Sequence, residues 1–324
     1  MDRFTLWEPQ PQADILGQEG SFGNIEWTYP ELIENIYEPM RKKHPDYITR
    51  RSIGFDTSGE YEMFAYEFTP RTYDRTVYLQ SGAHVIETDA YFGLARLLQM
   101  IADGEDPRLN GIREHVRLLV VPVVSVWGIS KRGSYEEIMD ADRWRFPHNA
   151  ARVNGNRDFT HQKAQETVNI IRYFAEYVDD ICFAIDCHST TDIVLGAYLL
   201  PYCNGMPDHI ATKLKYINRS LYEKHPTPIT LLFMGEGKDY PTNGPNYDPN
   251  AFHSYSAGFS GVFHVYTMTT EHNDYIYDSK LGTAKTMTLS VELLGNHLLQ
   301  ICEDPDFLQL TRRARGLAGA PSDK

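Results

Sequence analysis

Hydrophobic and polar residues alternate between a helical period and a strand-like period along this chain. A stretch that begins at Thr28 carries apolar residues at helical spacing and predicts a helix that ends near His44. Two β-favouring runs follow at 47–53 and 61–68, joined by a turn-rich segment. Runs of this kind predict a pair of strands at the edge of a sheet.

Nearly continuous apolar runs come next, as expected for strands that are buried on both faces. They occupy 116–124 and 181–185, and a short β-favouring run at 76–80 precedes them. Further strand-like runs are 193–200 and 262–267, and 125–159 is expected to be mostly loop. Helices are predicted from Glu87 onwards and over 162–177, 209–223 and 285–301.

Strands that alternate with helices predict an α/β fold of one domain, with a mixed, mostly parallel twisted sheet flanked by helices. We expect residues 1–27 to form an N-terminal lead-in, 28–305 the main domain and 306–324 a C-terminal tail. No internal repeat interrupts this organisation.

Composition disfavours several classes of partner and of metal site. The chain of 324 residues has a formal net charge of −13, which disfavours binding to nucleic acid. Four cysteines without a CxxC pair suit neither a disulfide scaffold nor a cysteine-based metal site. With no signal-peptide pattern and no apolar run long enough to span a membrane, we expect a cytoplasmic protein.

Polar residues directly follow three of the strand-like runs, namely His84 with Glu87, then His188, and finally Glu271. The carboxyl ends of parallel strands meet at one edge of a sheet, where ligands bind. Two imidazoles and a carboxylate are ligands that Zn²⁺ accepts, and a hydrolytic zinc site keeps a fourth position for water. The pattern is therefore compatible with a zinc site, while each motif alone also fits a surface residue or a capped loop.

Four motifs occur in a fixed order: Gly-x-His-x-x-Glu at 82–87, Asn-Arg-Asp-Phe at 156–159, Ile-Asp-x-His-Ser at 185–189, and a late strand followed by Glu271. This order resembles the zinc metallocarboxypeptidases of the carboxypeptidase A type over about residues 28–300. The resemblance implies that His84, Glu87 and His188 hold one Zn²⁺ per chain. It also implies an enzyme that removes C-terminal residues from peptides.

The same resemblance assigns two catalytic roles. Glu271 matches the general base, which takes a proton from the attacking water and passes it to the leaving amine; Asp274 is the alternative. Arg145 matches the arginine that stabilises the oxyanion, and Arg143 and Arg152 compete for this role.

Three further residues match positions that contact the substrate. Asn156 and Arg157 correspond to the pair that binds the terminal carboxylate, for which a guanidinium offers two parallel donors. The alternative for Arg157 is an ion pair with Asp158. Tyr255 resembles the mobile tyrosine that closes over the substrate, with Tyr247 as second choice. The expected partner is a peptide or small amide with a free carboxylate.

The chain departs from the family pattern at two positions. Asn154 stands where the family has an aspartate that orients the first zinc histidine, and Ile86 stands where many members have an arginine that contacts substrate. Two other functions stay open. One is a zinc-dependent deacylase of N-acyl amino acids, similar to aspartoacylase and succinylglutamate desuccinylase. The other is a non-catalytic member of the fold.

Overall fold

The computed structural model describes most of the predicted elements of the chain. The residues described are 4–10, 27–85, 87–131, 148–189, 196–199, 207–225, 262–271, 284–312 and 316.

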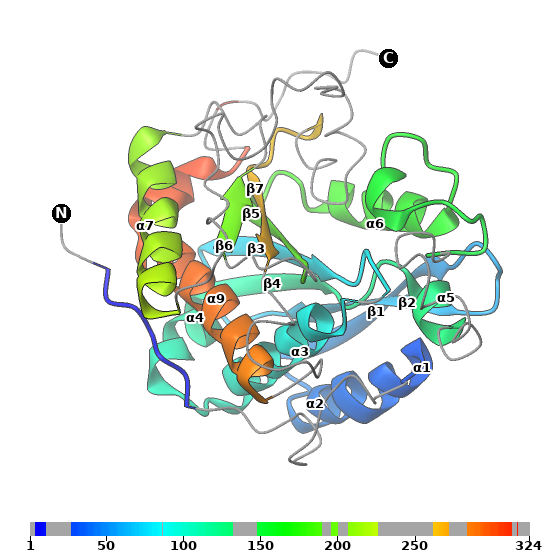
Figure 1. Cartoon of the computed structure of the whole chain (residues 1–324), viewed down its shortest axis with the longest axis horizontal. Coiled ribbons are helices and arrows are strands. Elements are labelled where there is room, and N and C mark those ends of the chain that lie inside the picture. Colours follow the sequence, from blue (N-terminus) through cyan, green and yellow to red (C-terminus); the bar gives the residue numbers. More distant parts are fainter. Residues whose placement is uncertain are drawn as a thin grey trace.

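Within these residues, one mixed sheet of seven strands runs through the molecule in the order β1–β2–β4–β3–β5–β7–β6 (Figure 1). The strands are β1 (Ile48–Phe55), β2 (Glu62–Phe68), β3 (Arg75–Ser81), β4 (Val116–Val121), β5 (Ile181–Cys187), β6 (Gly196–Leu199) and β7 (Thr267–Glu271). The four central strands β4, β3, β5 and β7 are parallel, whereas β2 and β6 run antiparallel to their neighbours. The predicted fold class is therefore confirmed.

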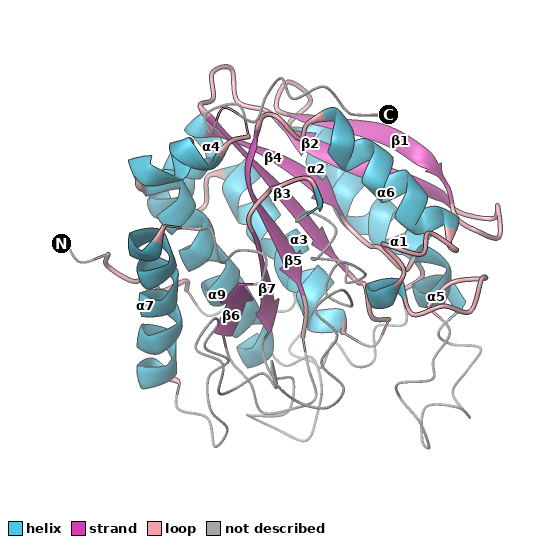
Figure 2. Cartoon of the chain, turned by 90° about the horizontal axis from the view of Figure 1, so that it is seen from above, coloured by secondary structure: helices cyan, strands magenta, loops and turns pink. Residues whose placement is uncertain are grey.

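Helices cover both faces of this sheet. In Figure 1, α6 lies on one side of the sheet, and α1, α2, α3 and α9 lie on the other; Figure 2 shows the same layers from above. The helices are α1 (Tyr29–Leu32), α2 (Glu38–Lys43), α3 (Thr88–Asp103), α4 (Asn110–His115), α5 (Val126–Lys131), α6 (Gln165–Glu176), α7 (Asp208–Lys224) and α9 (Ala284–Glu303).

The central strands β3, β4 and β5 are largely buried on both faces, which suits the apolar runs that they contain at 77–79, 118–121 and 181–185. Every residue of β3 and of β5 is buried. Helix α3 is also buried on almost all sides, because it packs between the sheet and α9. Gly93 permits this close approach, since a Cβ at this position would collide with the Ser290 hydroxyl of α9. These layers make the strand ends rigid supports for a site.

The first predicted helix begins as expected but is interrupted in the middle. Thr28 and Glu31 form a reciprocal capping box at the start of α1. A π-helical turn (Ile33–Tyr37) then leads into α2, whose second residue is Pro39. Proline has no amide hydrogen to continue the α-helical ladder, so a local change of hydrogen-bond pattern at this position is expected.

One strand boundary differs from the prediction. The run at 262–267 was expected to be a strand, whereas β7 occupies Thr267–Glu271. The threonines at 267, 269 and 270 are buried in the sheet, so polar β-branched residues continue the strand where hydrophobicity falls. Glu271 is consequently the last residue of the strand rather than part of a following loop.

Residues of the expected lead-in and of the expected tail also pack against the core. The Trp7 side chain is buried, and its backbone N–H donates to Asn296 Oδ1 of α9 at 2.8 Å. Phe307 and Leu310, in the 3₁₀ turn at Pro305–Leu310, are also buried. The division at 28 and 305 stays a prediction. In the part of the chain that the structure describes, no helix is long and apolar enough to cross a bilayer.

Candidate metal centre

The first two predicted ligands lie in the connection from β3 to α3. His84 follows the strand after a turn in which Gly82 has a positive φ of 65°. Two backbone hydrogen bonds tie this turn to the segment after β4: Val124 N donates to Ser81 O, and Ser125 N donates to Gly82 O. Glu87 then directly precedes the first residue of α3. The turn therefore holds an imidazole and a carboxylate at the carboxyl edge of the sheet.

The third predicted ligand comes from the neighbouring strand. His188 follows the last residue of β5, and its backbone N–H donates to Thr270 O in β7 at 2.9 Å. Strands β3 and β5 pair in parallel, with Ser81 opposite Cys187. The two ligand-bearing strand ends are therefore adjacent, although Glu87 and His188 are 101 residues apart in sequence.

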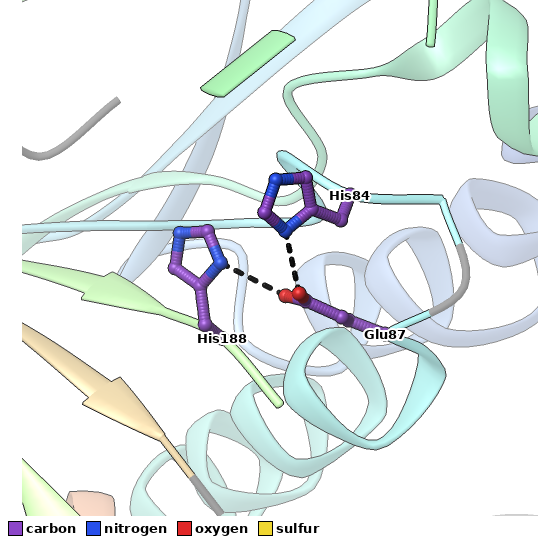
Figure 3. Close-up of side chains that lie close together, drawn as sticks. All are labelled: His84, Glu87 and His188. Carbon is purple, nitrogen blue, oxygen red and sulfur yellow. Dashed lines mark hydrogen bonds and ion pairs between the residues drawn. The ribbon is translucent and has the colours of Figure 1, made fainter. Parts of the chain in front are cut away.

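The three side chains converge, as Figure 3 shows. His84 Nδ1 lies 2.5 Å from Glu87 Oε1, and His188 Nδ1 lies 2.9 Å from Glu87 Oε2. One potential ligand atom from each residue lies within 4.8 Å of the others. The Ser189 backbone N–H donates to Glu87 Oε2 at 3.2 Å and helps to orient the carboxylate. All three residues are buried.

The electrostatics of this cluster suit a cation. Burial opposes ionisation of Glu87, but His84 and His188 outweigh it and hold the pKa of Glu87 well below its usual range. Burial likewise opposes protonation of His188, but Asp186 and Glu87 outweigh it and raise the pKa of His188 well above its ordinary value. A metal ion bound here would replace this positive charge, because a ligating imidazole must be neutral.

Asp186 is a polar neighbour of the site that sequence reasoning missed. Its Oδ2 lies 2.9 Å from His188 Nε2, on the side of the ring opposite the Nδ1 that faces Glu87. The signal was present in the sequence: residues two apart in an extended strand point to the same face, which places Asp186 beside His188.

His148 is a second residue that was missed. Its ring centroid lies 5.4 Å from that of His84, and its side chain is buried. Burial and the nearby His84 lower the pKa of His148 to about 4, so the imidazole is neutral at pH 7. No sequence signal marked it, because it stands in the long segment that was predicted as loop.

The expected general base, Glu271, lies at the same edge of the sheet. It ends β7 and directly follows Thr270, whose carbonyl accepts the backbone hydrogen bond from His188. Its side chain is partly buried. The backbone thus places this carboxylate beside the strand end that carries His188, and its role as general base stays a prediction.

Asn156 and Arg157 lie in a 3₁₀ turn (Gly155–Arg157) that Asn154 caps by accepting from the Asn156 backbone N–H at 2.8 Å. Arg157 is exposed, and its Nη1 donates to the backbone carbonyl of Asn156 at 2.9 Å. The turn packs on the metal-site loop, because a Cβ at Gly155 would lie 3.0 Å from Ala83 O. The expected carboxylate-binding pair is therefore close to the cluster.

Asp158 serves the fold at this point. Its carboxylate accepts from the backbone N–H groups of Lys163 and Ala164 and from the Thr167 hydroxyl. These bonds fix the start of α6. They also satisfy the buried Asp158 carboxylate. The predicted alternative, an ion pair between Arg157 and Asp158, did not include this role in the fold.

Arg145 and Tyr255 lie outside the described residues, as do the alternatives Arg143, Tyr247 and Asp274 and the divergent position Ile86. Arg152, the remaining alternative for the oxyanion, is exposed and has a positive φ of 56°.

Comparisons with known proteins relate the fold of this chain to that of solved carboxypeptidases. No protein-family model matches the sequence, and no curated protein matches it. Solved structures do. The metallo-carboxypeptidase of Burkholderia cenocepacia matches with a TM-score of 0.62 at 13% identity, over 85% of this chain and 69% of that one.

Two further structures give the same result. Thrombin activatable fibrinolysis inhibitor matches with a TM-score of 0.61 at 14% identity, over 87% of this chain and 80% of that one. Carboxypeptidase A of Helicoverpa armigera matches with a TM-score of 0.57 at 13% identity, over 90% and 74% respectively. The chain therefore has the zinc carboxypeptidase-like fold, and this fold carries a His-Glu-His group that could hold a metal ion.

Proposed function

We propose that this protein is a zinc-dependent hydrolase, and specifically a metallocarboxypeptidase that removes C-terminal residues from peptides. The observation that carries the proposal is the buried convergence of His84, Glu87 and His188 at adjacent strand ends of a carboxypeptidase-like sheet. Two imidazole nitrogens and one carboxylate oxygen form the ligand set that hydrolytic zinc sites use. A bound Zn²⁺ would polarise the scissile carbonyl and lower the pKa of a water molecule.

Side chains of the protein would bind the substrate and transfer the proton. Asn156 and Arg157 would bind the terminal carboxylate of the substrate, because their turn packs on the loop that carries His84 and an exposed guanidinium offers paired donors. Glu271, at the end of β7, would accept a proton from the attacking water and deliver it to the leaving nitrogen. Arg145 and Tyr255 keep their proposed roles at the oxyanion and over the substrate.

The experiment is a pair of measurements on purified protein. The metal content should be one Zn²⁺ per chain, and blocked peptides with a free C-terminus should be cleaved one residue at a time. Glu271→Gln should retain zinc and lose about 10²- to 10⁴-fold in kcat, the usual contribution of a general base. If Glu271→Gln retains both its zinc and full activity, Glu271 is not the base.

A second candidate, a deacylase of N-acyl amino acids, is favoured by one feature of the sequence. Ile86 replaces a substrate-contacting arginine of the carboxypeptidase pattern, which removes one contact to a peptide. A panel that contains both blocked dipeptides and N-acyl amino acids separates the two, since a deacylase would hydrolyse only the latter. Stoichiometric zinc without turnover of either class would identify a non-catalytic member of the fold.

A further inference from the structure

The side chain of Asp186 lies directly behind the third ligand of the metal group. The residue is 1% exposed, and its Oδ2 is 2.9 Å from His188 Nε2. This position follows from the strand: Asp186 is in β5, His188 is two residues further, and both side chains point to the same face. The rigid central strand therefore fixes the relative position of the two groups.

This contact determines how the imidazole can bind a metal. A carboxylate only accepts hydrogen bonds, so His188 must donate through Nε2–H. In the neutral ring the lone pair is then on Nδ1, the atom that lies 2.9 Å from Glu87 Oε2 within the metal group. We propose that Asp186 is a positioning residue for the metal, which holds His188 in the tautomer and orientation that direct Nδ1 at the ion.

Charge balance supports the same role. His84, Glu87 and His188 supply one negative charge to a divalent ion in a buried site. Buried charge is costly unless it is compensated nearby. Asp186 adds the second negative charge at hydrogen-bond distance from a ligand, without itself occupying a coordination position. Carboxylate–histidine pairs of this kind increase the basicity of the ligand and the affinity for the metal.

This inference rests on the proposed metal site, so the test measures Zn²⁺ affinity by competition with a chromophoric chelator. Asp186→Asn keeps a hydrogen-bond acceptor and removes the charge, and we expect about 10-fold weaker binding. Asp186→Ala removes both, and we expect about 100-fold weaker binding, the upper end of the usual effect of such partners. Urea unfolding of the metal-free variants checks that each retains its fold; if Asp186→Ala does not fold, Asp186→Asn carries the test.

Asp103→Asn is the matched control. Asp103 forms a similar pair with His44, at 2.6 Å, but on the far end of α3 from the metal group. Zinc affinity should not change in this variant. A spectroscopic measurement adds a readout that a purely structural role would not affect: in ¹⁵N-histidine spectra of the zinc-bound protein, the His188 Nε2 proton should exchange slowly in wild type and rapidly in Asp186→Ala.

The outcomes separate this inference from the proposed function. Wild-type protein that does not bind zinc contradicts the proposed function itself. Wild-type protein that binds zinc tightly while Asp186→Asn and Asp186→Ala bind it within twofold of wild type contradicts only the role of Asp186.

Discussion

Two buried histidines in different regions of this molecule have opposite acid–base behaviour. His188, at the end of β5, is 2% exposed and contacts the carboxylates of Asp186 and Glu87. His297, in α9, is 0% exposed, and its Nε2 lies 3.1 Å from the amide oxygen of Asn218 in α7. The pKa of His188 is raised well above its ordinary value, whereas burial lowers the pKa of His297 to about 3.

Burial is nearly equal in the two regions, so the neighbouring charge decides the difference. An amide cannot offset an imidazolium in a medium of low polarity, whereas two carboxylates can. The α7–α9 interface is thus built to keep a histidine neutral. The strand-end region is built to hold positive charge, supplied by a proton or by a metal ion.

The largest expected difference between the two regions is in their response to zinc. Zinc at a thousand times its Kd should stabilise the wild-type protein by about 4 kcal/mol, because it binds only the folded state. His188→Ala should lose most of this stabilisation, whereas His297→Gln should keep it. Thermal unfolding with zinc and with EDTA measures both. If zinc stabilised wild type and His188→Ala equally, His188 would not be a metal ligand.

A smaller difference is expected in acid. The folded-state pKa of His297, about 3, lies below its unfolded value near 6.5, so the unfolded chain binds the extra proton between these values. Stability from this group is present above pH 6.5 and is lost as pH falls, by about 1.4 kcal/mol per unit. Between pH 7 and pH 5 the loss is about 2 kcal/mol.

Urea unfolding at these two pH values tests this prediction. His297→Gln should lose about 2 kcal/mol less than wild type between pH 7 and pH 5. In the metal-free protein, the contribution of His188 to the pH dependence of stability has the opposite sign. Its raised pKa gives stability that is present below pH 6.5 and is lost as pH rises through the folded-state pKa. An unchanged pH dependence in His297→Gln would show that this region tolerates a charged imidazole.

The smallest effect is expected at an exposed pair on the same α7 helix that carries Asn218. Arg219 and Glu223 form an i,i+4 ion pair at 3.1 Å, with side chains that are 72% and 64% exposed. Solvent screens such pairs, so Arg219→Ala should change the free energy of unfolding by less than about 0.5 kcal/mol. A larger loss of unfolding free energy, measured by urea unfolding, would mean that this exposed ion pair contributes to stability.

Sequence reasoning predicted the parts of this protein in which a local pattern reflects the three-dimensional arrangement. The apolar runs at β3, β4 and β5 were recognised because both faces of these strands are buried. His84 and His188 were selected because each follows such a run. The end of β7 was misplaced, because its threonines carry a weaker hydrophobic signal than the residues before them.

The missed neighbours of the site differ in kind. Asp186 could have been found from the two-residue spacing that it shares with His188. His148 could not, since its position beside His84 depends on the path of a connection between distant elements. Hydrogen bonds such as that from Gly128 N to His148 O stabilise this path, and such bonds leave no periodic pattern in the sequence.

The pairing of β3 with β5 has a consequence for the way the chain acquires its shape. Strands β3 and β5 are neighbours in the sheet, but α3, α4, β4, α5 and α6 lie between them along the chain. Closing so large a loop is slow and has an entropic cost. The proposed zinc site would therefore be incomplete during synthesis until β5 has left the ribosome and docked. We expect the metal ion to bind late in folding and to stabilise a nearly complete sheet, rather than to nucleate the folding of the sheet.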